Sequence, residues 1–212
     1  MAARRCASHT LLGRLDPPES VSRDGRRCLH DEHVTVPLTT ERLELRPWRA
    51  SDAPAVVEIF GFPEVLSNLG DPAHPSSAPD LERAERTVAK WFEIGEPDGR
   101  GCWAVTERGS DRVVGGVLLL TLDPLSGPSR EEDVEIGWWL HPDVWGRGYA
   151  TEAGRAALGH AWEYGLPRVH AVTHPGNEDS MKVCRKLGMT HEGLRQTPWF
   201  EGAMEQFVVE AP

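Results

Sequence analysis

The sequence lacks several features that would assign it to a particular class of protein. Its four cysteines include no Cys-x-x-Cys pair, so neither a disulfide scaffold nor a zinc site is indicated, and its histidines show no metal-ligand spacing. No apolar run approaches the length of a membrane span. A basic excess is also missing, because the formal net charge is -10, which argues against a nucleic-acid surface. We therefore expect a cytoplasmic protein without a metal, a membrane contact or a nucleic-acid partner.

The chain length of 212 residues suits one domain with a sizeable core. Residues 1–33 differ from the rest: they hold scattered arginines, prolines and glycines and no helical or strand periodicity. They also lack the apolar core of a secretory signal. The sequence therefore predicts a disordered N-terminal extension over residues 1–33 and a folded domain over residues 34–212.

One stretch contains a strand, a glycine-containing loop and a helix in that order. Val134–Leu140 is a short apolar run rich in β-branched and aromatic residues, which predicts a buried strand. From Ala150 to Trp162 the apolar residues recur at helical spacing. Between them lies Trp145-Gly146-Arg147-Gly148-Tyr149-Ala150. The unit resembles neither a dinucleotide-binding fingerprint nor a P-loop, since both glycine patterns are missing.

The loop in this unit has the features of an anion site. The first turn of a helix has unpaired N–H groups and the positive end of the helix dipole. Gly146 and Gly148 would let a phosphate approach the main chain, and Arg147 adds a forked positive charge. The alternative is an ordinary strand-to-helix turn that uses glycine for geometry alone.

A second loop and helix, Asn177–Met189, distinguishes these alternatives. Its Asn177-Glu178-Asp179-Ser180 and Lys186-Leu187-Gly188-Met189 are similar to the Asn-x-x-Ser and Lys-Leu-Gly-Phe sequences of the GNAT superfamily of N-acetyltransferases. The glycine loop resembles the pyrophosphate loop of that family, with Trp145 at a position usually held by Gln or Arg. Thr40-Glu41-Arg42-Leu43-Glu44-Leu45-Arg46-Pro47 matches the opening of the RimJ/RimL-like branch, which acetylates protein N-termini.

The resemblance implies an α/β (α+β) fold: a single GNAT-type domain with a mixed, mostly antiparallel sheet of about 6–7 strands flanked by helices. The two central parallel strands are expected to splay, so that the pantetheine arm of the cofactor enters between them. Periodicity and turn signals give the remaining elements. The expected strands are 42–48, 101–106, 112–122, 134–140, 168–173, 190–195 and 206–209, and the expected helices include 51–60 and 80–92.

The resemblance also implies the residues that bind acetyl-CoA as co-substrate. Main-chain groups of the strand 134–140 would pair with the pantetheine amides, the glycine loop would hold the pyrophosphate, and Asn177 would contact the pantetheine arm. The predicted cofactor-binding residues are Trp138, Trp139, Leu140, Gly146, Arg147, Gly148, Tyr149, Ala150, Thr151 and Asn177. Lys182 or Lys186 is a candidate partner of the 3′-phosphate.

Two side chains are candidate catalytic groups. An amine must lose its proton before it attacks a thioester, and Glu135, on the strand beside the acetyl group, is the candidate general base. The alternative interpretation is that Glu135 is a carboxylate at a strand edge that faces solvent. Ser180 is the candidate donor of a proton to the departing coenzyme sulfur, and its alternative is a helix N-cap.

Aromatic residues outside these motifs have two interpretations. Trp48, Phe60, Phe62, His74 and Trp91 would either line an acceptor pocket or belong to the core, which is the more common fate of aromatic side chains. Trp199 and Phe200 are predicted to be exposed, and they are the basis for expecting a homodimer as one candidate assembly.

The function predicted from these features is an acetyl-CoA-dependent N-acetyltransferase that transfers an acetyl group directly to a primary amine, on a protein N-terminus or a small molecule. One alternative is a protein that binds acyl-CoA without turnover, as a sensor or a structural protein. Another is a toxin-like member that acts on aminoacyl-tRNA, which the acidic balance disfavours.

Overall fold

The computed structural model describes residues 35–69, 77–94, 99–128, 130 and 133–212. The predicted extension, residues 1–33, lies outside the described residues, as does His74. One sheet organises the described chain, with the strand order β1-β2-β3-β4-β5-β6-β8-β7. Its strands are β1 (Leu38–Thr39), β2 (Leu43–Pro47), β3 (Gly101–Glu107), β4 (Val113–Thr121), β5 (Val134–Leu140), β6 (Arg168–Thr173), β7 (Thr190–Gln196) and β8 (Ala203–Glu210).

The sheet has the mixed, mostly antiparallel arrangement that the sequence predicts. All neighbouring strands are antiparallel except β5 and β6, which are parallel. The eight strands exceed the expected number because the short edge strand β1 pairs with β2, Leu38 lying opposite Leu45. Two residues at a sheet edge carry too little periodicity to be recognised in a sequence.

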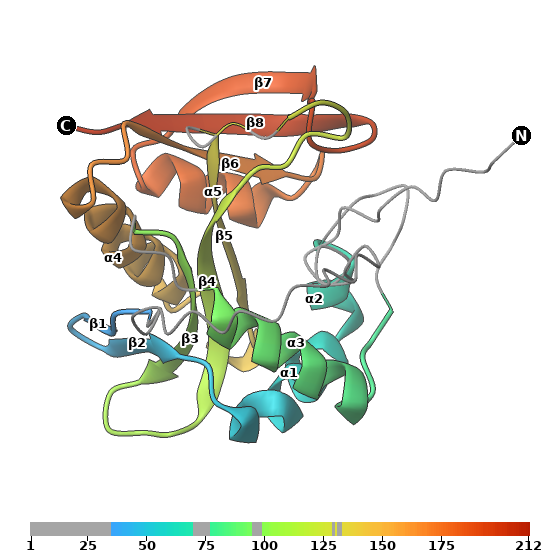
Figure 1. Cartoon of the computed structure of the whole chain (residues 1–212), viewed down its shortest axis with the longest axis vertical. Coiled ribbons are helices and arrows are strands. Elements are labelled where there is room, and N and C mark those ends of the chain that lie inside the picture. Colours follow the sequence, from blue (N-terminus) through green and yellow to red (C-terminus); the bar gives the residue numbers. More distant parts are fainter. Residues whose placement is uncertain (1–34, 70–76, 95–98, 129, 131–132) are drawn as a thin grey trace, which may run out of the picture.

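Helices cover both faces of the sheet (Figure 1). α4 packs on the side opposite to α1 and α3, and α5 contacts α4, β6 and β7. The helices are α1 (Ala53–Phe60), α2 (Pro63–Leu66), α3 (Leu81–Glu93), α4 (Tyr149–Glu163) and α5 (Glu178–Lys186), with single 3-10 turns at Ala50–Asp52 and Pro142–Val144.

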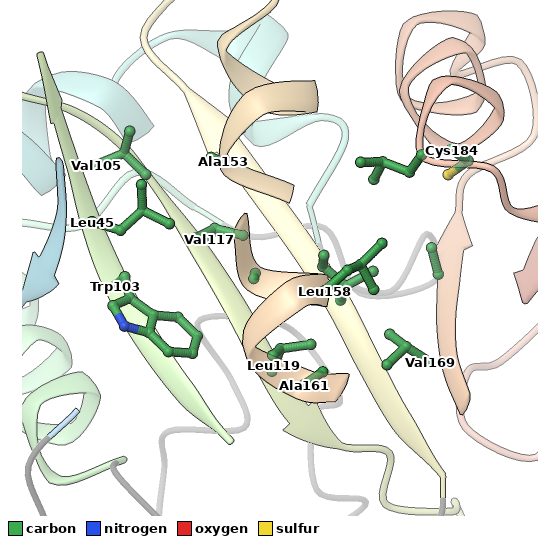
Figure 2. Packing of buried hydrophobic residues seen from close by; sticks show 14 of the residues in the cluster. Leu45, Trp103, Val105, Val117, Leu119, Ala153, Leu158, Ala161, Val169 and Cys184 are labelled. Atoms are coloured by element: carbon green, nitrogen blue, oxygen red, sulfur yellow. The ribbon is translucent and has the colours of Figure 1, made fainter. Parts of the chain in front are cut away.

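The core beneath α4 follows from the alternation of side chains along the strands. Trp103 and Val105 of β3 point to this face together with Leu45 and Val117, as Figure 2 shows. Small residues of α4 pack against them, and Gly154 lies so close to Leu187 that an added Cβ would come within 2.9 Å of that side chain. The small residues therefore allow α4 to lie close to both the sheet and the C-terminal end of α5.

The opposite face is filled by aromatic rings. Trp48, Phe60 and Trp91 are at most 1% exposed and surround Trp139 of β5, with the ring centroids of Trp91 and Trp139 5.0 Å apart. These three residues are core rather than pocket lining, which decides between the two interpretations of the sequence. Phe62 is half-buried and meets the ring of His141 edge-on at 4.9 Å.

Two glycines in β4 make room for β5. A Cβ on Gly116 would lie 2.3 Å from the indole of Trp139. A Cβ on Gly115 would lie 2.2 Å from the carbonyl oxygen of Trp139. The register between β3 and β4 shifts beside them, so that Val114 has no residue opposite. This irregularity is a β-bulge, a feature that glycine in a strand often accompanies.

A buried ion pair joins β2 to the start of α1. Arg46 donates to both carboxylate oxygens of Asp52, at 2.8 and 2.9 Å, and each side chain is only 6% exposed. Asp52 also accepts from the backbone N–H of Arg49 at 2.7 Å. This bidentate pair fixes the chain direction between the first long strand and the first helix.

The prediction that Trp199 and Phe200 are exposed is wrong. They are 6% and 7% exposed and pack with Leu122 and Met204 in a small third cluster. The segment is held against the end of β4 because the backbone N–H of Leu125 donates to Pro198 O at 2.7 Å. The expectation of a homodimer therefore loses its basis in this pair.

Candidate functional site

The two parallel strands at the centre of the sheet separate after one position. β5 and β6 share a single register pair, Glu135 opposite His170, close to the start of β5. Beyond it, no described strand pairs with the β6 side of β5. The predicted splay is therefore present, and the main chain of β5 from Ile136 onward is available to a ligand on that side.

The loop after β5 is shaped by its own residues. His141 accepts at Nδ1 from the N–H of Asp143 at 3.2 Å and so caps the turn Pro142–Val144. The indole of Trp145 donates to Leu140 O at 2.9 Å. Trp145 therefore ties the loop back to the strand that precedes it.

Gly146 and Gly148 have the backbone conformations that the loop needs. Their φ angles are 75° and 81°, a left-handed region that other residues rarely adopt. A Cβ on Gly146 would meet nothing within 4 Å among the described residues. Gly146 thus leaves the main chain of the loop open to close approach by a ligand.

α4 differs from α3 and α5 at its N-terminus. Asp80 caps α3 and Asn177 caps α5 through their side chains, whereas the N-cap of α4 is Gly148, for which the structure gives no side-chain cap. The first N–H groups of a helix need an acceptor from outside it. At α4 a ligand anion is well placed to supply that acceptor.

A pocket of about 440 Å³ lies between this loop and α5. It is lined by the end of β5, the glycine loop, the first turn of α4 and one side of α5. Lys182 and Lys186 add positive charge to its wall. Nine of the predicted cofactor residues line it: Trp138, Trp139, Leu140, Gly146, Gly148, Tyr149, Ala150, Thr151 and Asn177.

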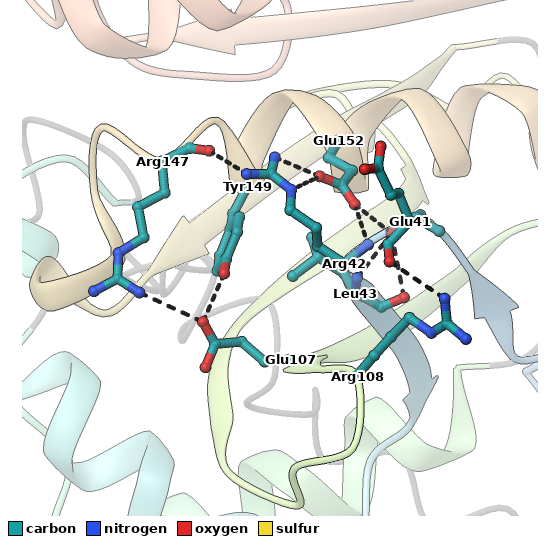
Figure 3. Close-up of polar contacts among 9 residues, drawn as sticks. Glu41, Arg42, Leu43, Glu107, Arg108, Arg147, Tyr149 and Glu152 are labelled. Carbon is teal, nitrogen blue, oxygen red and sulfur yellow. Dashed lines mark hydrogen bonds and ion pairs between the residues drawn. The ribbon is translucent and has the colours of Figure 1, made fainter.

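Arg147 is the one predicted cofactor residue that does not line this pocket. Its side chain is half exposed and reaches toward Glu107 of β3, with Nη1 3.5 Å from Oε1 (Figure 3). The same carboxylate oxygen accepts from the hydroxyl of Tyr149 at 2.6 Å. This hydrogen bond is the main reason that the pKa of the Tyr149 phenol is raised.

A second, smaller pocket of about 90 Å³ lies between the splayed strands. Glu135, the candidate base, lines it and is half-buried, so the alternative of a carboxylate that simply faces solvent does not describe its position. Apolar residues form most of the wall. The two pockets share Asn68, Leu69, Trp138, Trp139, Asn177 and Ser180.

Ser180 therefore lies where the two pockets meet. It does not cap α5, because the cap is Asn177, whose Oδ1 accepts from the backbone N–H of Ser180 at 3.1 Å. The alternative role of Ser180 as an N-cap is wrong: the helix begins three residues earlier than that role requires. The Ser180 side chain is thus not needed for capping and lies at the junction.

Some pocket residues escaped the sequence analysis. Thr173 and His174 line the smaller pocket at the end of β6, and Asn68 and Leu69 line both pockets from the segment after α2. The position of His174 directly after a parallel strand was the available signal, since ligands in α/β sheets bind at the carboxyl ends of such strands. Asn68 and Leu69 belong to no recognisable motif.

The described residues show neither a metal site nor a membrane-spanning helix. They contain no group of three or more His, Cys, Asp or Glu side chains arranged to hold a metal ion. None of their helices combines the length and the apolar character needed to cross a membrane.

A splayed sheet, an uncapped helix N-terminus behind a glycine loop, and an adjoining pocket with a carboxylate together define an acyl-group transferase. The chain belongs to the acetyltransferase (GNAT) domain family, whose sequence model matches residues 42–190, and it is an N-acetyltransferase of that family. The prediction of a GNAT enzyme of the RimJ/RimL type is confirmed.

Known proteins with a similar sequence or fold fit this assignment. The chain is 29% identical over 158 residues to the uncharacterized N-acetyltransferase YnaD of Bacillus subtilis, which covers 74% of this chain and 84% of YnaD. It is 28% identical over 159 residues to an FsC-acetyl coenzyme A-N(2)-transacetylase of Aspergillus fumigatus, covering 73% of this chain and 65% of that protein. A RimL ribosomal L7/L12 alpha-N-protein acetyltransferase in complex with coenzyme A shares the fold, with a TM-score of 0.66 at 17% identity over 82% of this chain and 98% of RimL.

Proposed function

We propose that this protein transfers an acetyl group from acetyl-CoA directly to a primary amine, on a protein N-terminus or on a small molecule. The observation that carries the proposal is the junction of the two pockets at Asn177 and Ser180. The larger pocket suits the coenzyme and the smaller one the acetyl group and the amine. Direct transfer then needs no movement of the acetyl group through a covalent enzyme intermediate.

The larger pocket fits coenzyme A in its chemistry. The diphosphate would lie at the glycine loop, where α4 offers N–H groups without a side-chain cap. The pantetheine amides would pair with the main chain of β5 on the side that β6 leaves unpaired. Lys182 and Lys186 are the nearby cations for the 3′-phosphate. Arg147 contributes its N–H, while its side chain pairs with Glu107.

The reaction begins with deprotonation of the amine. An α-amine has a pKa of about 8 and a lysine one of about 10.4, so part or most of the acceptor is protonated at neutral pH. Glu135 accepts this proton, directly or through water. The neutral nitrogen then attacks the thioester carbonyl carbon, and a β5 backbone N–H stabilises the oxyanion that forms.

The nitrogen of that intermediate releases its extra proton to solvent, and collapse then forms the amide and breaks the carbon–sulfur bond. Ser180 donates a hydrogen bond to the departing sulfur and passes it a proton, which the serine regains from solvent. The products are the acetylated amine and free coenzyme A. The relatives support nitrogen as the acceptor atom, since one is named an N(2)-transacetylase and another an alpha-N-protein acetyltransferase.

Two measurements test the proposal. Calorimetry should detect acetyl-CoA binding by the wild type, and release of coenzyme A thiol should reveal turnover with at least one member of a panel of N-terminal peptides and small amines. Glu135→Gln and Ser180→Ala should each lower kcat about 100-fold or more while leaving acetyl-CoA binding within about twofold. Glu82→Gln on the exposed face of α3 is the matched control and should behave as wild type.

Failure of wild-type binding would overturn the proposal. Tight binding without turnover on any amine would favour the alternative of a protein that binds acyl-CoA and does not react it. Turnover that survives both substitutions would leave the reaction in place and overturn the roles of Glu135 and Ser180.

A further inference from the structure

Arg42, which directly precedes β2, reaches the N-terminus of α4 with its side chain. Its Nε donates to Oε2 of Glu152 at 2.7 Å, and its Nη1 donates to the backbone carbonyl of Arg147 at 2.9 Å (Figure 3). The guanidinium carbon also lies 4.9 Å from the ring centroid of Tyr149. One side chain therefore contacts the glycine loop and the first turn of the helix behind it.

The carboxylate of Glu152 is held from several directions. Its Oε1 accepts from the hydroxyl of Thr40 at 2.6 Å and from the backbone N–H of Arg42 at 2.9 Å. Partial burial alone would raise the pKa of this carboxyl, yet the pKa is lowered because these hydrogen bonds and Arg42 favour the charged form. Glu152 is thus a fixed negative charge in the first turn of α4.

The negative charge of Glu152 disfavours anion binding at the proposed site. The first turn of α4 is where a diphosphate would bind, and a carboxylate there repels it. Arg42 offsets this repulsion, because its guanidinium lies against the carboxylate and points its remaining donors toward the loop. The contact between Nη1 and Arg147 O also gives this loop carbonyl a hydrogen-bond donor and so fixes its direction.

We propose that Arg42 is a positioning residue for the diphosphate-binding loop, which it orients through Arg147 O while neutralising Glu152. The proposal rests on the function proposed above. It gives a role to the Thr40–Leu43 segment, which was recognised in the sequence but has no place in the pockets.

The test compares ligands with and without the diphosphate. Arg42→Ala should weaken coenzyme A binding about tenfold in calorimetry, since it removes a charge-assisted contact and leaves the Glu152 charge unbalanced. Binding of S-acetylpantetheine, which has no diphosphate, should stay within about twofold of wild type. Arg86→Ala, which removes an exposed arginine paired with Glu82 on α3, is the control and should change neither value.

A second variant separates charge from folding. Glu152→Gln keeps an acceptor for Thr40 and Arg42 N–H but removes the charge, so Arg42→Ala/Glu152→Gln should recover at least half of the lost binding free energy. Equal coenzyme A binding by wild type and Arg42→Ala would overturn the role of Arg42 and leave the proposed function in place. An equal loss for both ligands would also overturn it, because it would show general damage, whereas a wild type that does not bind coenzyme A would remove the proposed function itself.

Discussion

The side chain of Asn177 caps the helix that carries Ser180: its Oδ1 accepts from the Ser180 N–H at 3.1 Å. The amide group is then divided between two tasks. Oδ1 holds α5, and because Asn177 also lines both pockets, Nδ2 is the donor that we expect to contact the coenzyme. Structural and binding contributions of this residue can be separated by choosing which half of the amide to change.

Asn177→Ala should lower the free energy of unfolding by about 1 kcal/mol, because α5 loses its cap. Asn177→Asp retains an acceptor at the helix N-terminus and should match wild-type stability, yet it lacks the Nδ2 donor and should bind acetyl-CoA more weakly. Urea denaturation and calorimetry give the two readings. Wild-type affinity in Asn177→Asp would exclude a contact from Nδ2 to the coenzyme.

Gly116→Ala and Gly159→Ala should change stability in opposite directions. A Cβ at Gly116 would overlap the Trp139 indole, and overpacking of this kind costs about 1–3 kcal/mol. Gly159 lies on an exposed part of α4 with no described atom within 4 Å of its Cβ, so alanine there should stabilise by about 0.4–1 kcal/mol. Urea midpoints of the two variants measure the difference. A Gly116→Ala variant with the stability of wild type would mean that Trp139 can move with little loss of free energy of unfolding.

Arg46→Met should be strongly destabilising, by about 3–5 kcal/mol, because it leaves the buried carboxylate of Asp52 without its cation. The double variant Arg46→Met/Asp52→Ala should be more stable than Arg46→Met alone, since no unpaired charge is then buried. Thermal denaturation of the three proteins measures both effects. A double variant less stable than the single one would mean that Asp52 contributes mainly through Arg49 N–H.

Stability should fall as the pH drops below about 6.5, the ordinary histidine pKa. Burial lowers the pKa of both His160 and His170, so the unfolded chain takes up protons at a pH where the folded chain does not. The stability contributed by their neutral forms is present above the unfolded pKa and is lost as the pH falls toward the folded one. Urea midpoints at pH 7.5 and 5.5 should differ less in His160→Leu and in His170→Phe than in the wild type. An unchanged difference in both variants would contradict this assignment.

Much of the fold was accessible from local sequence signals. The range of β6 and the end of α1 at Phe60 agree with the structure because β-branched alternation and a proline-glycine boundary are local features. The motifs of the glycine loop and of Asn177–Met189 identified the family that the chain resembles, and that resemblance predicted nine of the residues that line the larger pocket. Asn177 as a cap could also have been recognised, since asparagine three residues before an N–H is a common arrangement.

Other features depend on contacts between distant parts of the chain. Trp199 and Phe200 stand in a polar, turn-rich segment, and only the folded chain shows that this segment covers Leu122. Arg42 and Glu152 are 110 positions apart in the sequence, and neither their residue types nor their spacing predicts the contact between them. The same holds for Glu107, which meets Arg147 and Tyr149 across the sheet.

The single register pair between β5 and β6 has a consequence for how the molecule responds to its ligand. Hydrogen bonding across the sheet nearly stops at Glu135 and His170, so β1–β5 and β6–β8 are two slabs joined there mainly by side-chain packing. A ligand that pairs with the free side of β5 would act as a bridging strand and stiffen the joint between the slabs. Amide hydrogen exchange along the end of β5 and along β6 should therefore slow on binding, while exchange in β2 and β3 stays unchanged.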